Sequence, residues 1–446
     1  MGQYGRRVRP PTLLTAVATV TLALAGCVTP PRSPAPGGEL FRVRIEVPTA
    51  LARAPFAVPR YLNLPAGWSA AVYARVDAAR FLAATPDGAL LVSQPATGSV
   101  LVVRRQGDGT GRATPFLTGL NRPHDIVFAE LSGRTWVFVA EADRIVRYPY
   151  QPGDARARPG EVVADGLPDT STPELRGQYA HVLKNIAVHD GTLYVSIAST
   201  CNACAEDTRS DPRRGAIYRY DAAGTNAGRR LVATGLRNAE GLAVAPGTDD
   251  LWAVVNNRDN TLVPDDRDVD GDGTGDRGER LPQFIDDYPV EPFVRVRDGA
   301  FYGWPFCNPV ADPGRRDLGF DRDAELNPDG ASADCATATR IDVGLPAHSA
   351  PLGLTFTGGT KAPDLGAVVA LHGSWNRTRP DGYRLVHFPW ADGPGEQRDL
   401  ATGWLDPATS KWWGRPVDVA VDADGSLVVS DDGAGALIRL TPPPRI

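Results

Sequence analysis

Short apolar runs separated by turn residues recur along the chain in one fixed order. A polar residue precedes a first apolar run, a turn rich in Pro, Gly and Asp follows, and a second apolar run comes next, as in residues 235–256. Runs of this length bounded by turn residues are typical of short β-strands. The first runs lie at 82–84, 126–128, 186–188, 241–244, 352–356 and 419–421, and the second at 90–92, 135–139, 192–197, 251–255, 367–371 and 426–429.

The repetition of this unit predicts the fold class. Six similar units, most followed by a third apolar run, favour an all-β, six-bladed β-propeller with long inter-strand insertions over a sandwich. No long helical stripe competes with this pattern. We assign the propeller to residues 43–446, and we expect the run 69–74, which precedes the first unit, to complete the last blade and close the ring.

The polar residue ahead of each first run is a histidine or an arginine. The innermost strands of a propeller line a central channel, so a residue just before each inner strand lies near the axis on one face. These positions predict a ring around one mouth of the channel, made of Arg80, His124, His181, Arg237 with Asn238, His348 and Arg415. A cationic ring predicts an anionic ligand, although any single member could instead form a hydrogen bond to the adjacent blade.

A first insertion, at about residues 256–292, contains the acidic run DVDGDGTGDRGE. Its spacing matches the calcium-loop pattern, in which alternate oxygen ligands curl around one hard cation. Gly273 would permit the sharp turn, and no flanking helices are evident. The alternative is a solvated acidic loop. The sequence thus predicts a calcium site made of Asp268, Asp270, Asp272, Asp276 and Glu279.

A second insertion, at about residues 301–348, opens with the aromatic run FYGWPF and contains two cysteines. The aromatic side chains would be either walls of a substrate site or the core of the loop. Proximity favours the disulfides Cys201–Cys204 and Cys307–Cys335 among three possible connectivities. The alternative for Cys201 and Cys204 is a redox pair or half of a zinc site.

The first 26 residues read as a leader rather than as part of the fold. Three arginines precede a short apolar stretch that ends in Leu-Ala-Gly-Cys27, which resembles a bacterial lipobox. We expect lipidation of Cys27, a flexible tether over residues 27–42, and an exported protein held at a membrane on its periplasmic or cell-surface face. Without the leader the net charge changes from −6 to −9, which argues against nucleic acid as a partner.

Taken together, several motifs resemble the glucose/sorbosone dehydrogenase family, and its sorbosone-dehydrogenase-like branch is the nearer one. The resemblance runs from about residue 65 to the end of the chain. The motifs are GLNRPHDIVF (119–128), HVLKNIAV (181–188), LYVSIASTCNAC (193–204), GLRNAEGLAV (235–244), FYGWPFCNP (301–309), LHGSWNR (371–377) and GRPVDVAVDADGSLVVSDD (414–432).

This resemblance implies a propeller that binds pyrroloquinoline quinone (PQQ), an anionic tricarboxylate, and that oxidises a sugar or polyol hydroxyl or an aldehyde hydrate by hydride transfer to PQQ. His181 matches the family's general base. Arg237 matches the arginine beside the quinone oxygens, and Asn238 matches its cofactor-binding neighbour. The resemblance also implies a calcium ion beside the quinone. The electron acceptor is not indicated.

The chain departs from the glucose enzymes at two motifs. Arg415 matches the first arginine of their Arg-x-Arg-Asp, but Val417 replaces the second. Where they carry Ser-x-Lys-Arg, this chain has Asn376 before Arg377, so Arg377 is the remaining candidate for a cofactor contact. These departures argue against glucose as the substrate.

Two other functions are compatible with a six-bladed propeller. A calcium-dependent lactonase needs Glu, Asn and Asp around an axial metal, and the His and Arg positions found here count against it. A non-catalytic surface propeller that binds a ligand or partner remains the alternative to a PQQ-dependent dehydrogenase.

Overall fold

The computed structural model describes residues 38–444. The predicted leader, Cys27 and most of the predicted tether lie outside the described residues. The described part is almost entirely β-structure, and no helix in it is long and apolar enough to cross a membrane. Its helices are α1 (Pro282–Asp287) and the short 3₁₀ helices η1 (Thr49–Leu51), η2 (Pro95–Thr97), η3 (Pro173–Leu175), η4 (Ala205–Arg209) and η5 (Cys335–Thr337).

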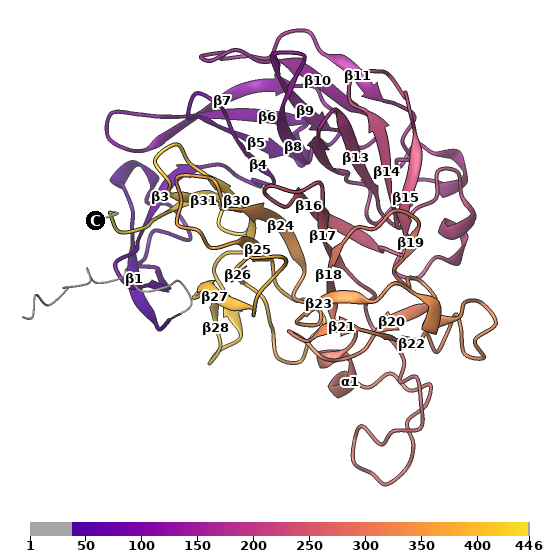
Figure 1. The fold of residues 1–446 in the computed structure, drawn as a ribbon. Helices are drawn as coiled ribbons and strands as arrows, with labels where there is room; N and C mark the ends of the chain where they lie inside the picture. Colours follow the sequence, from indigo (N-terminus) through magenta and orange to yellow (C-terminus); the bar gives the residue numbers. More distant parts are fainter. Residues whose placement is uncertain (1–37, 445–446) are drawn as a thin grey trace, which may run out of the picture. The chain divides into compact units, whose positions relative to one another are not determined.

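Six sheets form the blades of a propeller, which confirms the predicted fold class. Their innermost strands gather around one centre (Figure 1). Each of these strands contacts the innermost strand of the next blade, and the contacts run from β4 through β8, β12, β16, β24 and β30 back to β4. The ring is therefore closed.

The first three blades follow the chain in order from the innermost strand outward. Blade 1 contains β4 (Leu82–Ala84), β5 (Leu90–Gln94), β6 (Ser99–Arg105) and β7 (Gly111–Thr118). Blade 2 contains β8 (Ile126–Leu131), β9 (Arg134–Ala140), β10 (Ile145–Pro149) and β11 (Glu161–Ala164). Blade 3 contains β12 (Asn185–His189), β13 (Thr192–Ile197), β14 (Ala216–Asp221), β15 (Arg230–Thr234) and β19 (Ala300–Phe301).

Of the other three blades, blade 4 includes strands from the second insertion, blade 5 is built from consecutive strands, and blade 6 includes strands from the N-terminal side. Blade 4 contains β16 (Asn238–Val244), β17 (Leu251–Asn256), β18 (Glu291–Arg295), β23 (Ile341–Leu345) and β21 (Arg316–Leu318). Blade 5 contains β24 (Pro351–Phe356), β25 (Ala367–Leu371), β26 (Arg384–Phe388) and β27 (Arg398–Ala401). Blade 6 contains β30 (Pro416–Val421), β31 (Leu427–Asp431), β32 (Ala436–Thr441), β3 (Ser69–Arg75), β1 (Leu40–Glu46) and β2 (Tyr61–Pro65). Two small hairpins pair β20 (Cys307–Pro309) with β22 (Phe320–Arg322) and β28 (Leu405–Asp406) with β29 (Lys411–Trp412).

Strand β3 closes the ring as predicted. It pairs antiparallel with β32, from Ser69 opposite Thr441 to Arg75 opposite Ala436. The predicted tether boundary at residue 42 was wrong, because β1 begins at Leu40 and pairs with both β2 and β3. The side chain of Ile45 on β1 is buried in the core of this blade, so apolar burial holds the segment in the sheet.

The innermost strand of blade 4 starts earlier than its apolar run. It begins at Asn238, and its pairing with β17 shifts between Ala239 and Gly241, which leaves Glu240 as an extra residue. Such a bulge redirects a side chain. A Cβ atom on Gly241 would lie 2.4 Å from the carbonyl oxygen of Leu352 in blade 5, so the close approach of the two blades requires glycine there.

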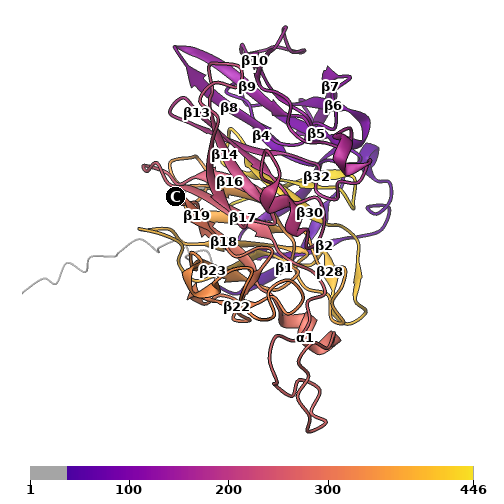
Figure 2. The same cartoon turned by 90° about the vertical axis from the view of Figure 1, so that its right-hand side faces the viewer.

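The two long insertions differ in their packing. The acidic loop projects away from the blades beyond α1 (Figures 1 and 2). In the second insertion Tyr302 and Trp304 are each only 2% exposed. Tyr302 packs in the core cluster formed by blades 3 and 4, and Trp304 lies against Gly215, so these two aromatic side chains belong to the protein core and not to the wall of an open site.

Both predicted disulfides are present, Cys201–Cys204 and Cys307–Cys335. They close chain segments of very different length, with sequence separations of 3 and 28. Loop-closure entropy gives about 1.6 kcal/mol of stabilisation for the short bridge and about 3.6 kcal/mol for the long one. The long bridge is therefore suited to stabilising the fold, whereas the short one mainly constrains its own turn.

Candidate active site at one mouth of the channel

The predicted ring residues lie where the innermost strands begin. Each precedes the first residue of its strand by one to four positions, except Asn238, which is the first residue of β16. Antiparallel pairing within each blade brings the end of the second strand to the same edge, as Asn238 opposite Asn256 shows. Side chains that follow second strands therefore share this mouth with the predicted ring.

The first polar cluster is centred on Asp259, three residues beyond the end of β17. Its Oδ2 lies 3.0 Å from Nη2 of Arg237, and its Oδ1 lies 3.4 Å from Nδ1 of His348 and 3.5 Å from Nδ2 of Asn376. Burial alone would raise the pKa of Asp259, but the hydrogen bond from His348 and the charge of Arg237 lower it. A charged Asp259 thus joins two predicted ring residues from blades 4 and 5.

The second cluster is centred on Asp432, the residue after β31. Its two oxygens lie 2.9 Å from Nη1 of Arg80 and 2.9 Å from Nε2 of His372. Burial would raise the pKa of Asp432, but the hydrogen bond and charge of His372, together with Arg80, hold it well below its usual range. The predicted ring is therefore not purely cationic, because two carboxylates are built into it.

Arg415 is held by backbone rather than by a carboxylate. Its Nη2 donates to the carbonyl oxygen of Gly373 at 2.7 Å, and its Nε donates to that of His372 at 3.2 Å. The guanidinium lies 5.6 and 5.7 Å from the ring centroids of Tyr383 and Trp412. The charge of Arg415 is thus placed at the mouth without a direct ion pair among the described residues.

His181 is oriented through Nδ1. This atom lies 2.9 Å from both the carbonyl oxygen and the hydroxyl oxygen of Ser199, and that hydroxyl donates to the carbonyl of Cys201. Both neighbours of Nδ1 are acceptors, so Nδ1 carries the proton and Nε2 keeps its lone pair. Nε2 has no hydrogen-bond partner within residues 38–444.

The electrostatic surroundings keep His181 neutral. Burial lowers its pKa to about 4, and the positive charge of Arg237 adds to this effect. At neutral pH the imidazole is therefore uncharged, with its one proton on Nδ1, and Nε2 can accept a second proton. This is the protonation state that a general base requires.

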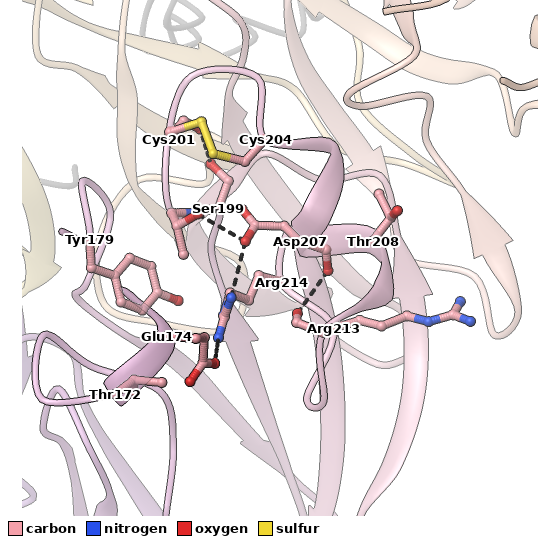
Figure 3. A network of polar contacts seen from close by, with 12 residues as sticks. Thr172, Glu174, Tyr179, Ser199, Cys201, Cys204, Asp207, Thr208, Arg213 and Arg214 are labelled. Carbon is pink, nitrogen blue, oxygen red and sulfur yellow. Dashed lines mark hydrogen bonds and ion pairs between the residues drawn. A yellow bond between two sulfur atoms is a disulfide. The ribbon is translucent and has the colours of Figure 1, made fainter. Parts of the chain in front are cut away.

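An ion-pair network supports the segment that carries Ser199 (Figure 3). The backbone N–H of Thr200 donates to Asp207 at 2.7 Å. Arg214 lies between two carboxylates, 3.3 Å from Asp207 and 2.6 Å from Glu174. These contacts tie η3 and η4 to the residue next to Ser199, and so they hold the partner of His181 in place.

Side chains from two blades that are not neighbours in the ring meet at the inner strands. Asn238 donates to Oε1 of Glu240 at 2.9 Å, and Oε2 of Glu240 lies 3.9 Å from Nε2 of His124 in blade 2. Burial raises the pKa of Glu240 and lowers that of His124. Glu240, the extra residue of the bulge in β16, therefore reaches past blade 3 to blade 2.

Val417, at the position where the glucose enzymes carry an arginine, has an apolar role here. It is fully buried in a cluster with Phe81 and Leu352. These three side chains come from blades 6, 1 and 5. A charged side chain at Val417 would have to enter this apolar cluster, which burial makes costly.

Arg377 is bound mainly by backbone carbonyls. Its polar contacts within the described residues are the carbonyl oxygens of Ala347 and Arg379, each at 3.1 Å, and Asp287 of α1 at 3.7 Å. Its neighbour Asn376 instead reaches Asp259. Of this pair, Asn376 is the one brought to the candidate site.

The acidic loop brings together three of its five predicted ligands. Carboxylate oxygens of Asp268, Asp270 and Asp276 lie within 4.8 Å of one another, and Asp276 is buried. Asp272 and Glu279 are not in this group.

Sequence reasoning missed three residues of the site: Asp259 and Asp432, which balance the charges of the ring, and His372, which pairs with Asp432. All three follow second strands, after Asn256, Leu371 and Asp431 respectively. A signal was available, since antiparallel strands return to the edge where they began. Reading the end of each second run beside the start of each first run would have found them.

Comparison with known proteins finds a matching family model and curated relatives of similar sequence. Residues 62–442 match a family model described as TrAA12-like. A pyrroloquinoline quinone-dependent pyranose dehydrogenase of Coprinopsis cinerea is 30% identical over 243 residues, which are 46% of this chain and 30% of that protein. An uncharacterised protein of Borreliella burgdorferi is 27% identical over 216 residues, which are 47% of this chain and 48% of that protein. The chain thus spans about half or less of the curated relatives it matches.

Solved structures share the fold at low sequence identity. The holo PQQ domain of the Coprinopsis cinerea pyranose dehydrogenase superposes with a TM-score of 0.68 at 22% identity, covering 85% of this chain and 97% of that domain. The calcium structure of a Trichoderma reesei enzyme of carbohydrate-active family AA12 superposes with a TM-score of 0.68 at 19% identity, covering 85% of this chain and 96% of that chain. A PQQ-bound aldose sugar dehydrogenase of Streptomyces coelicolor superposes with a TM-score of 0.50 at 17% identity, covering 85% of this chain and 100% of that chain.

These likenesses confirm the resemblance to propeller sugar dehydrogenases that the motifs indicated. The family model covers most of the chain, from β2 to the last strand, β32. On this match, the chain belongs to the TrAA12-like family.

Proposed function

We propose that this protein is a PQQ-dependent oxidoreductase that oxidises a hydroxyl or aldehyde hydrate of a sugar or polyol. The observation that carries the proposal is His181, a neutral imidazole whose Nδ1 is held by Ser199 and whose Nε2 has no partner in the described part of the chain. The names of its TrAA12-like and quinoprotein relatives support the same chemistry.

The residues at the mouth fit a planar, anionic quinone. Arg80, Arg237 and Arg415 supply three positive charges against the two carboxylates Asp259 and Asp432. Several buried polar atoms at the mouth lack a hydrogen-bond partner among residues 38–444, and such atoms cost free energy unless a ligand or water pairs with them. They are Nδ1 of His124, Oγ of Ser349 and Oδ1 of Asn376.

Arg237, with Asn238, Arg80, His348 and Arg415 around it, would hold PQQ. When bound, PQQ supplies the electrophilic quinone that accepts a hydride. Nε2 of His181 would take the hydroxyl proton as the hydride leaves the same carbon, so the substrate loses one proton and one hydride. The buried cation of Arg237 would stabilise negative charge that develops beside it, and Asp259 keeps that cation in position.

We further propose a substrate other than glucose, of the sorbosone or aldose type. The support is that two cationic contacts of the glucose enzymes are replaced, one by Val417 in an apolar cluster and one by Asn376 beside Asp259. The substrate hydroxyls would therefore meet fewer charged donors here. A non-catalytic propeller that binds a ligand or partner is the alternative that the variants below distinguish.

Substitution of His181 tests the proposed reaction. We expect His181→Ala to lower kcat/KM for the active sugar by about 10²- to 10⁴-fold, because the general base is lost, while PQQ affinity changes little. The assay is an artificial-acceptor dye with a sugar panel, after reconstitution with PQQ and calcium. His189→Ala is the matched control, since His189 lies at the end of the following strand and pairs with surface Asp249. Turnover by His181→Ala equal to that of the control would contradict the assignment, and a wild type without turnover would favour the binding alternative.

We also propose that the acidic loop binds calcium. Three carboxylates placed within 4.8 Å repel one another unless a cation lies between them. Calcium should raise the thermal midpoint and protect residues 256–281 from proteolysis, and Asp276→Asn should abolish both effects. Asp298→Asn is the control, because this exposed carboxylate lies outside the loop. No bound calcium by elemental analysis of the wild type would refute the site.

Finally, we propose that the protein is exported and held at a membrane by lipid on Cys27. The support is the lipobox-like sequence alone. Membrane fractionation should place the full chain with membranes and the Cys27→Ser variant in the soluble fraction; equal distribution of the two would argue against the anchor.

A further inference from the structure

The turn closed by Cys201 and Cys204 lies against the candidate site. It follows the end of β13 and the residues Ser199 and Thr200, whose contacts orient His181 and reach Asp207. The disulfide is seen beside Ser199 in Figure 3. The residues between the two cysteines are Asn202 and Ala203. Both cysteines and both enclosed residues are half-buried.

Asn202 forms hydrogen bonds with three other segments. Its Oδ1 accepts from the backbone N–H of Asp259 at 2.8 Å, and its Nδ2 donates to the carbonyl of Asp259 at 2.8 Å. Its own carbonyl accepts from Nε of Arg237 at 3.2 Å and from the indole N–H of Trp304 at 3.0 Å. The residue is therefore bonded both to the proposed cofactor-binding arginine and to the backbone of Asp259, whose carboxylate pairs with that arginine.

The contacts of Asn202 complete a closed arrangement. Arg237 is bonded to Asp259 through Nη2, Asp259 is bonded to Asn202 through its backbone, and Asn202 is bonded to Arg237 through its carbonyl. Two hydrogen bonds between the side chain and one residue's backbone fix both position and orientation. Because Arg237 is only 5% exposed, water could not readily replace these contacts.

The size of the disulfide loop indicates what the bridge contributes. A separation of 3 residues removes little entropy from the unfolded chain. The bridge instead restricts the conformations of the turn on which Asn202 lies. The far side of the same segment is held by Asp207 and Arg214 (Figure 3).

We propose that Asn202, held by the Cys201–Cys204 bridge, is a positioning residue that places Arg237 and Asp259 for PQQ binding and hydride transfer. This inference rests on the proposed function. It assigns to the disulfide a role at the site rather than a role in overall stability. Reduction of the Cys201–Cys204 bridge would then loosen the positioning of Arg237.

The test compares Asn202→Ala with a matched control, Asn63→Ala. The control removes the side-chain hydrogen bond of a half-buried asparagine on β2, an outer strand of blade 6, to Thr402, which follows β27 of blade 5. PQQ affinity is measured by absorbance titration. We expect Asn202→Ala to weaken binding about tenfold, since two hydrogen bonds are lost. At saturating PQQ, kcat should fall while the KM for sugar stays unchanged, because Arg237 is proposed to act on developing charge.

Two further measurements keep the inference open to refutation. Without PQQ, hydrogen exchange should speed up in residues 256–260 of Asn202→Ala but not of Asn63→Ala, because the N–H of Asp259 loses its acceptor. The variant Cys201→Ser/Cys204→Ser should reproduce both the weaker PQQ binding and the faster exchange. The triple variant, which combines these two substitutions with Asn202→Ala, should bind PQQ no more weakly than either parent variant, since the effects of residues that act on the same contacts are not additive.

The possible results separate this inference from the proposed function. A wild type that does not bind PQQ would refute the proposed function, and the exchange measurement would still decide whether Asn202 positions Asp259. Exchange and PQQ affinity of Asn202→Ala equal to those of Asn63→Ala would overturn the inference. Additive losses in the triple variant would overturn the link between the bridge and Asn202.

Discussion

The pairing of β3 with β32 is the interaction on which the site depends. It joins residues 69–75 to residues 436–441 and so closes the ring of blades. Closure brings blade 6 against blade 1, where the backbone N–H of Leu82 donates to Asp418 at 2.9 Å and Arg80 pairs with Asp432. Without closure the inner strands would have no common mouth, and residues separated by more than 300 positions could not form one cluster.

The closed ring brings several positively charged side chains close together, and two carboxylates compensate much of that charge. Arginines and histidines from six blades converge on one mouth, and burial makes unpaired cations unfavourable there. Asp259 and Asp432 each accept from an arginine and a histidine, so they hold these side chains in defined positions. Arg415, bound by carbonyls, keeps an excess of positive charge. This balance leaves a preorganised site suited to an anion, with the neutral imidazole of His181 near Arg237.

Much of this architecture could be predicted from the sequence, and the exceptions have physical reasons. Alternating apolar runs and turn residues locate the inner strands, and the polar residue before each run marks the mouth. The pattern of polar residues before first runs does not find Asp259 and Asp432, because these two residues reach the mouth at the ends of second strands. The apolar role of Val417 depends on Phe81 and Leu352, which are distant in the chain. Arg377, which was predicted to contact the cofactor, donates to the carbonyl of Ala347 beside His348, a tertiary contact that no local pattern reveals.

The most direct measurement is a titration of the purified apoprotein with PQQ, followed by absorbance, and then by addition of sugars without an electron acceptor. We predict saturable binding at micromolar or lower PQQ, followed by a spectral change to the reduced cofactor with at least one sugar or polyol. Absence of binding at micromolar PQQ, with calcium present and the protein folded, would contradict the central claim.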